Sequence, residues 1–161
     1  MAHPLHEQVR RLFVYRCAYC GAHEIGVGAE LTVDHYQPRA GGGGDELANL
    51  VYACHRCNQY KSDYWPTPAE AAAGLIVLHP QRHDLLQHYR ENELTGEVEP
   101  LTATGAFNIR LLHLNRPPLM AQRLARRAAE TLEQSLLMLA DETGQQERAI
   151  RILRTYLRLF R

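Results

Sequence analysis

Residues 31–61 read LTVDHYQPRAGGGGDELANLVYACHRCNQYK and place a strand-like run, a glycine-rich run and a cysteine pair close together. Residues 31–35 alternate apolar and polar side chains and include β-branched ones, so they predict a strand. The following QPRAGGGGDE predicts a loop, because Pro38 ends the strand and the four glycines permit almost any backbone angle. Residues 49–53 predict a second short strand, and residues 54–65 predict a helix that ends before a proline. The expected order is therefore strand, loop, strand, helix.

The four cysteines of the chain form two Cys-x-x-Cys pairs, one on each side of the first predicted strand. Two such pairs are typical of a structural zinc ion that four thiolates hold tetrahedrally. A redox pair or buried free thiols are the alternatives, but neither pair lies in the βαβ pattern that a thioredoxin-like site needs. Because 33 residues separate the pairs, the enclosed segment must form structure of its own. We expect one zinc ion per chain on Cys17, Cys20, Cys54 and Cys57.

Residues 16–65 contain motifs that follow one another in this order: C-x2-C, DH, P, GG, NL and C-x2-C-N-x2-K. In these motifs the segment resembles the HNH endonucleases, in their four-cysteine, zinc-containing ββα-metal branch. The resemblance implies an α+β fold with a small ββα-metal core pinned by the four-cysteine zinc site. It also implies metal-dependent hydrolysis of DNA phosphodiester bonds. The third letter of the name departs from the pattern, since Asn58 stands where many relatives have His. We treat Asn58 as an alternative metal ligand.

The resemblance assigns roles to four residues of this stretch. It makes His35 the general base, which suits an imidazole that titrates near neutral pH. It makes Asp34 and Asn58 the ligands of a catalytic divalent metal, and their oxygen atoms suit Mg²⁺ or Mn²⁺. Asn49 would fix the orientation of the base, whereas the plain alternative for an Asn at a loop end is a turn cap. Lys61, on nearly the same helix face as Asn58, either contacts a DNA phosphate or caps the helix end.

The 161 residues divide into a predicted core over residues 1–66, which begins with a helix over 4–14, and a mixed, then mostly helical extension over 67–161. We expect the extension to pack on or beside the core. Its predicted elements are a helix over 67–74, an extended run over 75–79, two strand-like runs joined near Gly96 within 84–101, and a helical or extended run over 107–115.

The end of the chain predicts two amphipathic helices, over residues 116–140 and 144–161. A stripe in the first helix is expected to pack inward; it consists of Leu124, Ala128, Leu132, Leu136 and Leu139. Arg123, Arg126 and Arg127 would then share an outer face that binds nucleic acid, although arginine-rich faces are more often merely solvated. The two helices could form a hairpin on the core, a homodimer interface or a nucleic-acid clamp.

Composition excludes some classes of protein. The net charge is zero, and 17 of the 18 basic side chains are Arg, so any nucleic-acid affinity must come from a local patch. No apolar run approaches the roughly 18 residues of a membrane span, and MAHPLHEQVRR lacks the apolar segment of a secretory signal. We therefore expect no membrane association and a cytoplasmic, reducing location, where disulfides are rare.

The function expected from these features is a metal-dependent HNH endonuclease that cleaves DNA. Two alternatives stay open. One is a zinc-stabilised DNA-binding module without cleavage activity. The other is a nuclease that acts on RNA, because no residue of the predicted site obviously distinguishes RNA from DNA by contacting a 2′-hydroxyl group.

Overall fold

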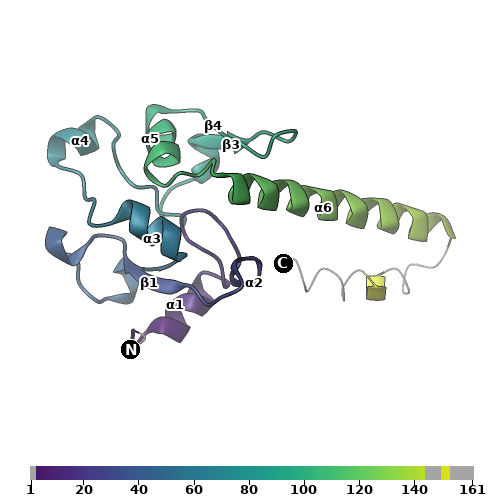
Figure 1. Ribbon diagram of the computed structural model, residues 1–161, viewed down its shortest axis with the longest axis horizontal. Coiled ribbons are helices and arrows are strands. Elements are labelled where there is room, and N and C mark those ends of the chain that lie inside the picture. The colour runs from purple at the N-terminus through teal and green to yellow at the C-terminus, as the bar shows by residue number, and fades with distance from the viewer. Residues whose placement is uncertain (1–2, 144–149, 153–161) are drawn as a thin grey trace.

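The computed structural model describes residues 3–143 and 150–152 (Figure 1). It confirms the predicted α+β class, with short helices, two small sheets and a helical C-terminal part. In chain order the elements are α1 (His6–Leu12), α2 (Glu24–Val27), β1 (Thr32–His35), β2 (Leu50–Ala53), α3 (His55–Lys61), α4 (Pro68–Ala72), β3 (Tyr89–Glu91), β4 (Val98–Pro100), α5 (Ala103–Leu111) and α6 (Pro117–Thr143).

The predicted order of strand, loop, strand and helix is confirmed in β1, β2 and α3. The two strands pair antiparallel, with Asp34 opposite Val51 and His35 opposite Leu50. All four residues of β2 are buried, which explains why this strand is almost continuously apolar. Helix α3 starts directly after β2, with Cys54 at its N-cap. In this ββα unit β1 and α3 lie near each other (Figure 1), and the Asn58 side chain of α3 donates to Thr32 Oγ1 of β1 at 3.3 Å.

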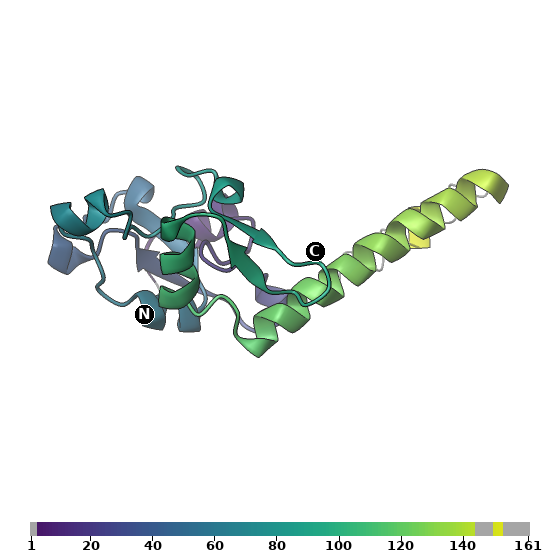
Figure 2. The same ribbon diagram turned by 90° about the horizontal axis from the view of Figure 1, so that it is seen from above.

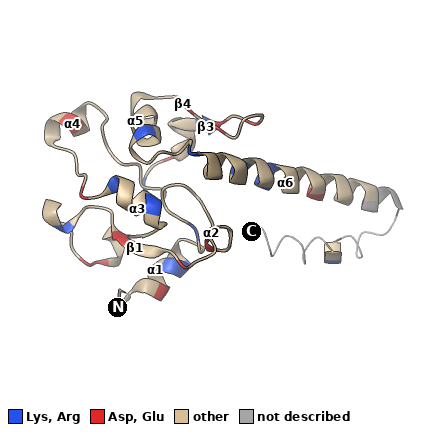
Figure 3. Cartoon of the chain, in the orientation of Figure 1, with Lys and Arg blue, Asp and Glu red and all other residues tan. Residues whose placement is uncertain are grey.

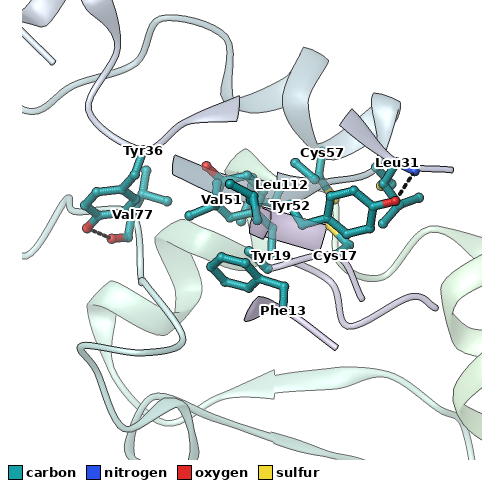
Figure 4. Close-up of a cluster of buried hydrophobic side chains, with 14 of the residues drawn as sticks. Phe13, Cys17, Tyr19, Leu31, Tyr36, Val51, Tyr52, Cys57, Val77 and Leu112 are labelled. Atoms are coloured by element: carbon teal, nitrogen blue, oxygen red, sulfur yellow. Dashed lines mark hydrogen bonds between the residues drawn. The ribbon is translucent and has the colours of Figure 1, made fainter. Parts of the chain in front are cut away.

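The hydrophobic core joins the ββα unit to segments on both sides of it. Helix α1 contributes Val9. The extension contributes Val77 and Leu112 (Figure 4). The Tyr36 hydroxyl donates a hydrogen bond to the Val77 carbonyl oxygen at 2.6 Å. Packing therefore crosses the predicted division at residue 66, and the extension covers part of the same core.

The extension contains the predicted hairpin, and its helix α5 (Ala103–Leu111) starts earlier than predicted. Strands β3 and β4 pair antiparallel, and Gly96 lies in the turn between them with a positive φ of 71°. Helix α5 begins at Ala103 and not near residue 107, because the Thr102 side chain caps it by accepting from the Gly105 N–H. Residues 75–79 join neither described sheet. Instead the Asn108 side chain hydrogen-bonds their backbone at Ile76 and Leu78.

The position of helix α6 differs from the prediction that its leucine stripe packs inward. Beyond its first turns it projects away from the core (Figures 1 and 2). Leu119 is buried, whereas Leu132 is 59% exposed and Leu139 56% exposed. The prediction that the leucine stripe packs inward is wrong, because the core ends before the stripe does. Most of the predicted second helix, residues 144–161, lies outside the described residues, so a homodimer formed through the two helices stays a prediction.

Among the described helices, none is both long enough and apolar enough to cross a membrane.

Candidate functional site

The four cysteines converge, as predicted. Cys17 and Cys20 come from the turn after α1, and Cys54 and Cys57 come from the start of α3. All four sulfur atoms lie within 4.8 Å of one another. Gly21, with a φ of 72°, closes the first turn, and the Cys17 N–H donates back to the Ala22 carbonyl oxygen at 2.9 Å.

The spacing of these sulfurs fits a tetrahedral metal ion such as zinc. Four Zn–S bonds of about 2.3 Å place neighbouring sulfurs about 3.8 Å apart in a regular tetrahedron. The Sγ atoms of Cys20 and Cys54 are 3.8 Å apart. The cluster therefore has the donor type and number of a structural zinc site, and the Cys20–Cys54 sulfur separation matches the tetrahedral value.

Asp34 lies at the bottom of a second polar site, next to α3. Alternation along β1 places Thr32 and Asp34 on the same face of the strand. The Asn58 Nδ2 group donates to Thr32 Oγ1 at 3.3 Å, which brings the Asn58 amide to that face. Asp34 Oδ2 accepts a 2.6 Å hydrogen bond from the Tyr19 hydroxyl and lies 3.4 Å from Lys61 Nζ. Since both of these partners contact Oδ2, Asp34 Oδ1 is the oxygen left for a cation.

Lys61 is a buried counter-ion of Asp34. Its side chain is 0% exposed, and its ammonium group donates to the His35 carbonyl oxygen at 2.7 Å and to the Ser62 carbonyl oxygen at 3.3 Å. Ser62 is the C-cap of α3, so its hydrogen bond from Lys61 agrees with the predicted alternative in which Lys61 caps the end of this helix. The ammonium group is enclosed by these partners in this structure, and the predicted contact with a DNA phosphate stays a prediction.

Burial affects the pKa of both members of this pair. Burial raises the pKa of Asp34, although Lys61 and Tyr19 both act in the opposite direction. Burial likewise lowers the pKa of Lys61, although Asp34 acts to raise it. Each group therefore depends on the other for its charge, because an isolated buried charge is costly.

His35 lies at the edge of this site, with its side chain 19% exposed. Its Nε2 atom is 2.6 Å from Asp45 Oδ1, which comes from the glycine-rich loop. Arg39 Nη2 holds the same carboxylate through contacts of 2.6 and 2.8 Å. Hydrogen bonds from His35 and then Arg39 lower the pKa of Asp45 to about 2. His35 is thus restrained through its ring by Asp45 and through its carbonyl group by Lys61.

Asn49 organises the loop that connects His35, the last residue of β1, to Asp45. Its Oδ1 atom accepts from the Gln37 N–H at 2.9 Å, and its Nδ2 group donates to the carbonyl oxygens of Gln37 and Gly44. Gln37 follows His35 by two residues, and Gly44 directly precedes Asp45. Asn49 is 5% exposed and has hydrogen bonds to the loop backbone, so its effect on His35 is indirect.

The predicted ligands and the predicted base face one open hollow of about 470 Å³. Its lining includes Asp34, His35, Asn58 and Arg39. Asn49 and Lys61 lie outside this lining, and they act on it through the loop backbone and through Asp34 and the His35 carbonyl group.

Sequence reasoning missed three residues that shape this site, namely Tyr19, Arg39 and Asp45. Tyr19 lies between two candidate zinc ligands, Cys17 and Cys20, and no sequence pattern indicated a role for it in the site. Asp45 had a weak signal, since it is an acid placed directly after a run of four glycines.

The three arginines of α6 are arranged differently from the prediction. Arg123 is 7% exposed and donates to the carbonyl oxygens of Gly96 at 3.0 Å and Leu114 at 2.8 Å. The prediction that it lies on an outer face is wrong, because its guanidinium group binds backbone oxygens between α6 and the β3–β4 turn. Arg126 pairs with Glu91, and Arg127 Nη1 lies 3.0 Å from Glu93 Oε1.

Acidic residues of the β3–β4 hairpin thus face the basic start of α6 (Figure 3). The two more exposed arginines have protein partners already. Nucleic-acid binding by Arg126 and Arg127 stays a prediction.

Comparison with known proteins adds two findings. Residues 17–63 match the model of the family described as HNH endonuclease. A segment of 49 residues is 47% identical to the CRISPR-associated endonuclease Cas9 of Corynebacterium diphtheriae. The matched segment covers 30% of this chain and 4% of that protein. The chain therefore spans only a small part of this relative. No solved structure matches the chain.

Proposed function

We propose that this chain, which carries an HNH endonuclease domain at residues 17–63, is a metal-dependent endonuclease that hydrolyses the phosphodiester bonds of DNA. The observation that carries the proposal is the meeting of Asp34, His35 and Asn58 at one open hollow, with Asp34 Oδ1 directed to no protein partner among the described residues. A phosphodiester needs an activated water, a cation near the leaving oxygen and firm positioning, and this hollow offers groups for each.

His35 acts as the general base in this proposal. The 2.6 Å contact to Asp45 is much shorter than the 3.4 Å contact to Arg39 Nε, so the Nε2 proton is donated to the carboxylate. This tautomer leaves Nδ1 unprotonated and able to accept a proton from water. Asp45 then stabilises the imidazolium ion that forms, in the way a carboxylate does for other histidine bases.

Asp34 and Asn58 are the proposed ligands of a catalytic Mg²⁺ or Mn²⁺ ion. The Asn58 Nδ2 group is occupied by Thr32, which leaves the amide oxygen as the available donor atom. Carboxylate and amide oxygens are the ligand types that these hard cations prefer. When bound, the metal supplies positive charge to the phosphate and the leaving oxygen.

Tyr19, Lys61 and Asn49 are positioning residues in this scheme. Tyr19 and Lys61 restrain one oxygen of Asp34, and Lys61 also holds the backbone of His35. Tyr19 lies between Cys17 and Cys20, so a structural zinc ion on the four cysteines would hold the residue that orients Asp34. Outer contacts of this kind commonly set the direction of a metal ligand.

Plasmid cleavage tests the proposal. Wild-type protein is incubated with Mg²⁺, with Mn²⁺ or with no added divalent ion, beside His35→Ala. His88→Ala is the matched control, because His88 contacts Thr102 and does not line the hollow. A chelator is omitted, since it would also remove metal from the cysteines.

We expect cleavage by wild type and by His88→Ala, and a loss of at least 100-fold in His35→Ala, in line with the usual contribution of a general base. Equal cleavage by wild type and His35→Ala would reject the assignment of the base. Salt-dependent DNA binding without cleavage by any metal would favour the zinc-stabilised binding module. Preferential digestion of RNA in a parallel assay would favour the RNA-directed nuclease.

A further inference from the structure

Arg116 reaches the cysteine cluster from outside the segment that matches the HNH family. It lies between α5 and α6, in the residue directly before Pro117. Its Nη2 group is 3.5 Å from Cys57 Sγ, 3.7 Å from Cys54 Sγ and 3.8 Å from Cys20 Sγ. One guanidinium nitrogen therefore contacts three of the four sulfurs.

The chain holds this guanidinium group in a defined place. Its Nη1 group donates to the carbonyl oxygens of Leu112 at 3.0 Å and His113 at 3.2 Å. The centre of the guanidinium lies 5.9 Å from the ring of Tyr60, and the His113 ring packs against the same tyrosine with ring centroids 4.2 Å apart. Leu112 belongs to the hydrophobic core, so the backbone that aims Arg116 is itself fixed.

The chemistry of the cluster explains why a cation is placed there. Four thiolates around one divalent zinc ion carry two net negative charges. Three of these cysteines are buried, and buried charge is costly unless another charge or hydrogen bonds compensate it. An arginine N–H group close to thiolate sulfur supplies both the charge and the hydrogen bond.

We propose that Arg116 compensates the charge of the metal-loaded cysteine cluster, so that zinc retention depends on the extension as well as on residues 17–63. The metal centre then joins three segments: the turn after α1, the start of α3 and the α5–α6 connection. The proposal concerns the cysteine site and holds whether or not the hollow at Asp34 cleaves nucleic acid.

Zinc transfer to a chromogenic chelator tests the proposal on the full, zinc-loaded chain. Arg116→Gln removes the charge, and Arg116→Lys keeps the charge but loses the forked donor group. Arg110→Gln is the matched control, since Arg110 is exposed, lies in α5 and contacts none of the sulfurs. Near-ultraviolet circular dichroism in excess zinc checks that each variant is folded.

We expect Arg116→Gln to lower the apparent zinc affinity by about 10- to 100-fold, the usual effect of losing an outer contact to a metal ligand. Arg116→Lys should lose less, and Arg110→Gln should match wild type. Wild-type zinc affinity in folded Arg116→Gln, or equal losses in Arg116→Lys and Arg116→Gln, would overturn the proposal.

A measurement on wild-type protein covers the case in which Arg116→Gln does not fold. The chain is loaded with an NMR-active cadmium isotope in place of zinc. We expect the Arg116 side-chain N–H protons to exchange slowly with solvent and to correlate with the metal through the sulfur contacts. Rapid exchange without any such correlation would overturn the proposal independently of the variants.

Discussion

Substituting methionine for Lys61 removes the only lysine of the chain and leaves the buried Asp34 carboxylate without its counter-ion. Methionine has a similar length and no charge, so it preserves most of the packing of the side chain. The companion variants are Asp34→Asn and the double variant with both changes. Together they form a cycle that isolates the interaction between the two charges.

The distance between the charges gives the size of the effect. Two unit charges separated by 3.4 Å attract by about 5 kcal/mol at an effective dielectric constant near 20. Desolvation of both groups offsets much of that attraction in the intact pair, but removal of one partner leaves the other buried and unpaired. We therefore expect Lys61→Met to lower the free energy of unfolding by about 3–5 kcal/mol at neutral pH.

The other two variants should lose less. Asp34→Asn keeps the two carbonyl partners of Lys61, so we expect a loss of about 1–3 kcal/mol. The double variant buries no charge at this position, so its loss should be about 2–3 kcal/mol smaller than the sum of the single losses.

Urea denaturation without Mg²⁺ or Mn²⁺, and with the structural metal retained, measures each free energy. The pH dependence has a defined sign. Because burial raises the pKa of Asp34, the stability linked to this group is present at low pH and is lost as pH rises through its folded pKa. Removal of Lys61 raises that pKa further, so the deficit of Lys61→Met should grow from acidic to neutral pH.

Two results would refute this reasoning. One is a coupling energy below about 0.5 kcal/mol, which is the level expected of independent sites. The other is unchanged stability in Lys61→Met together with a slope of log DNA affinity against log salt that is lower by about 0.9, which would indicate a phosphate contact.

Three further predictions concern the rest of the molecule. Cys54→Ser should unfold or aggregate the protein, because structural zinc supplies on the order of 10 kcal/mol in small metal domains; well-folded protein without bound metal would contradict this. Arg123→Gln should cost about 2–4 kcal/mol in urea denaturation, since it removes a charged donor from two carbonyl oxygens. The more exposed Arg126→Gln is its control, with a change within about 0.5 kcal/mol. Burial lowers the pKa of His79 to about 4, so wild-type stability should fall as pH drops from about 6.5 toward that value, and His79→Leu should lack this component.

The order of the core elements and the grouping of the cysteines were predictable because their determinants are local. Residues 31–35 alternate over one short strand, the glycines after Pro38 require a loop, and each Cys-x-x-Cys pair forms its own turn. The resemblance to the HNH endonucleases singled out Asp34, His35 and Asn58, and these three residues line one hollow. The catalytic roles of these three residues stay predictions.

Tyr19, Arg39 and Asp45 were not predicted, because Tyr19 and Arg39 look like ordinary loop residues and the position of Asp45 after four glycines is only a weak signal. Tyr19 reaches Asp34 only when the turn after α1 lies against β1. Arg39 and Asp45 meet only when Asn49 fixes the loop between them.

The sequence by itself determined which residues can form strands, turns and metal ligands, since these properties depend on neighbours within a few positions. Only the tertiary structure decided which cations are enclosed by distant segments, with Lys61 and Arg123 buried and Arg116 half-buried. Lys61 and Arg123 looked like surface groups, and Arg116 lies 96 residues from Cys20. A long basic side chain is stable inside a protein only where distant segments supply carboxylates, carbonyl groups or thiolates around it. The leucines of α6 looked like core residues but are largely exposed. Their helical spacing in the sequence is the same whether or not a core lies beside them.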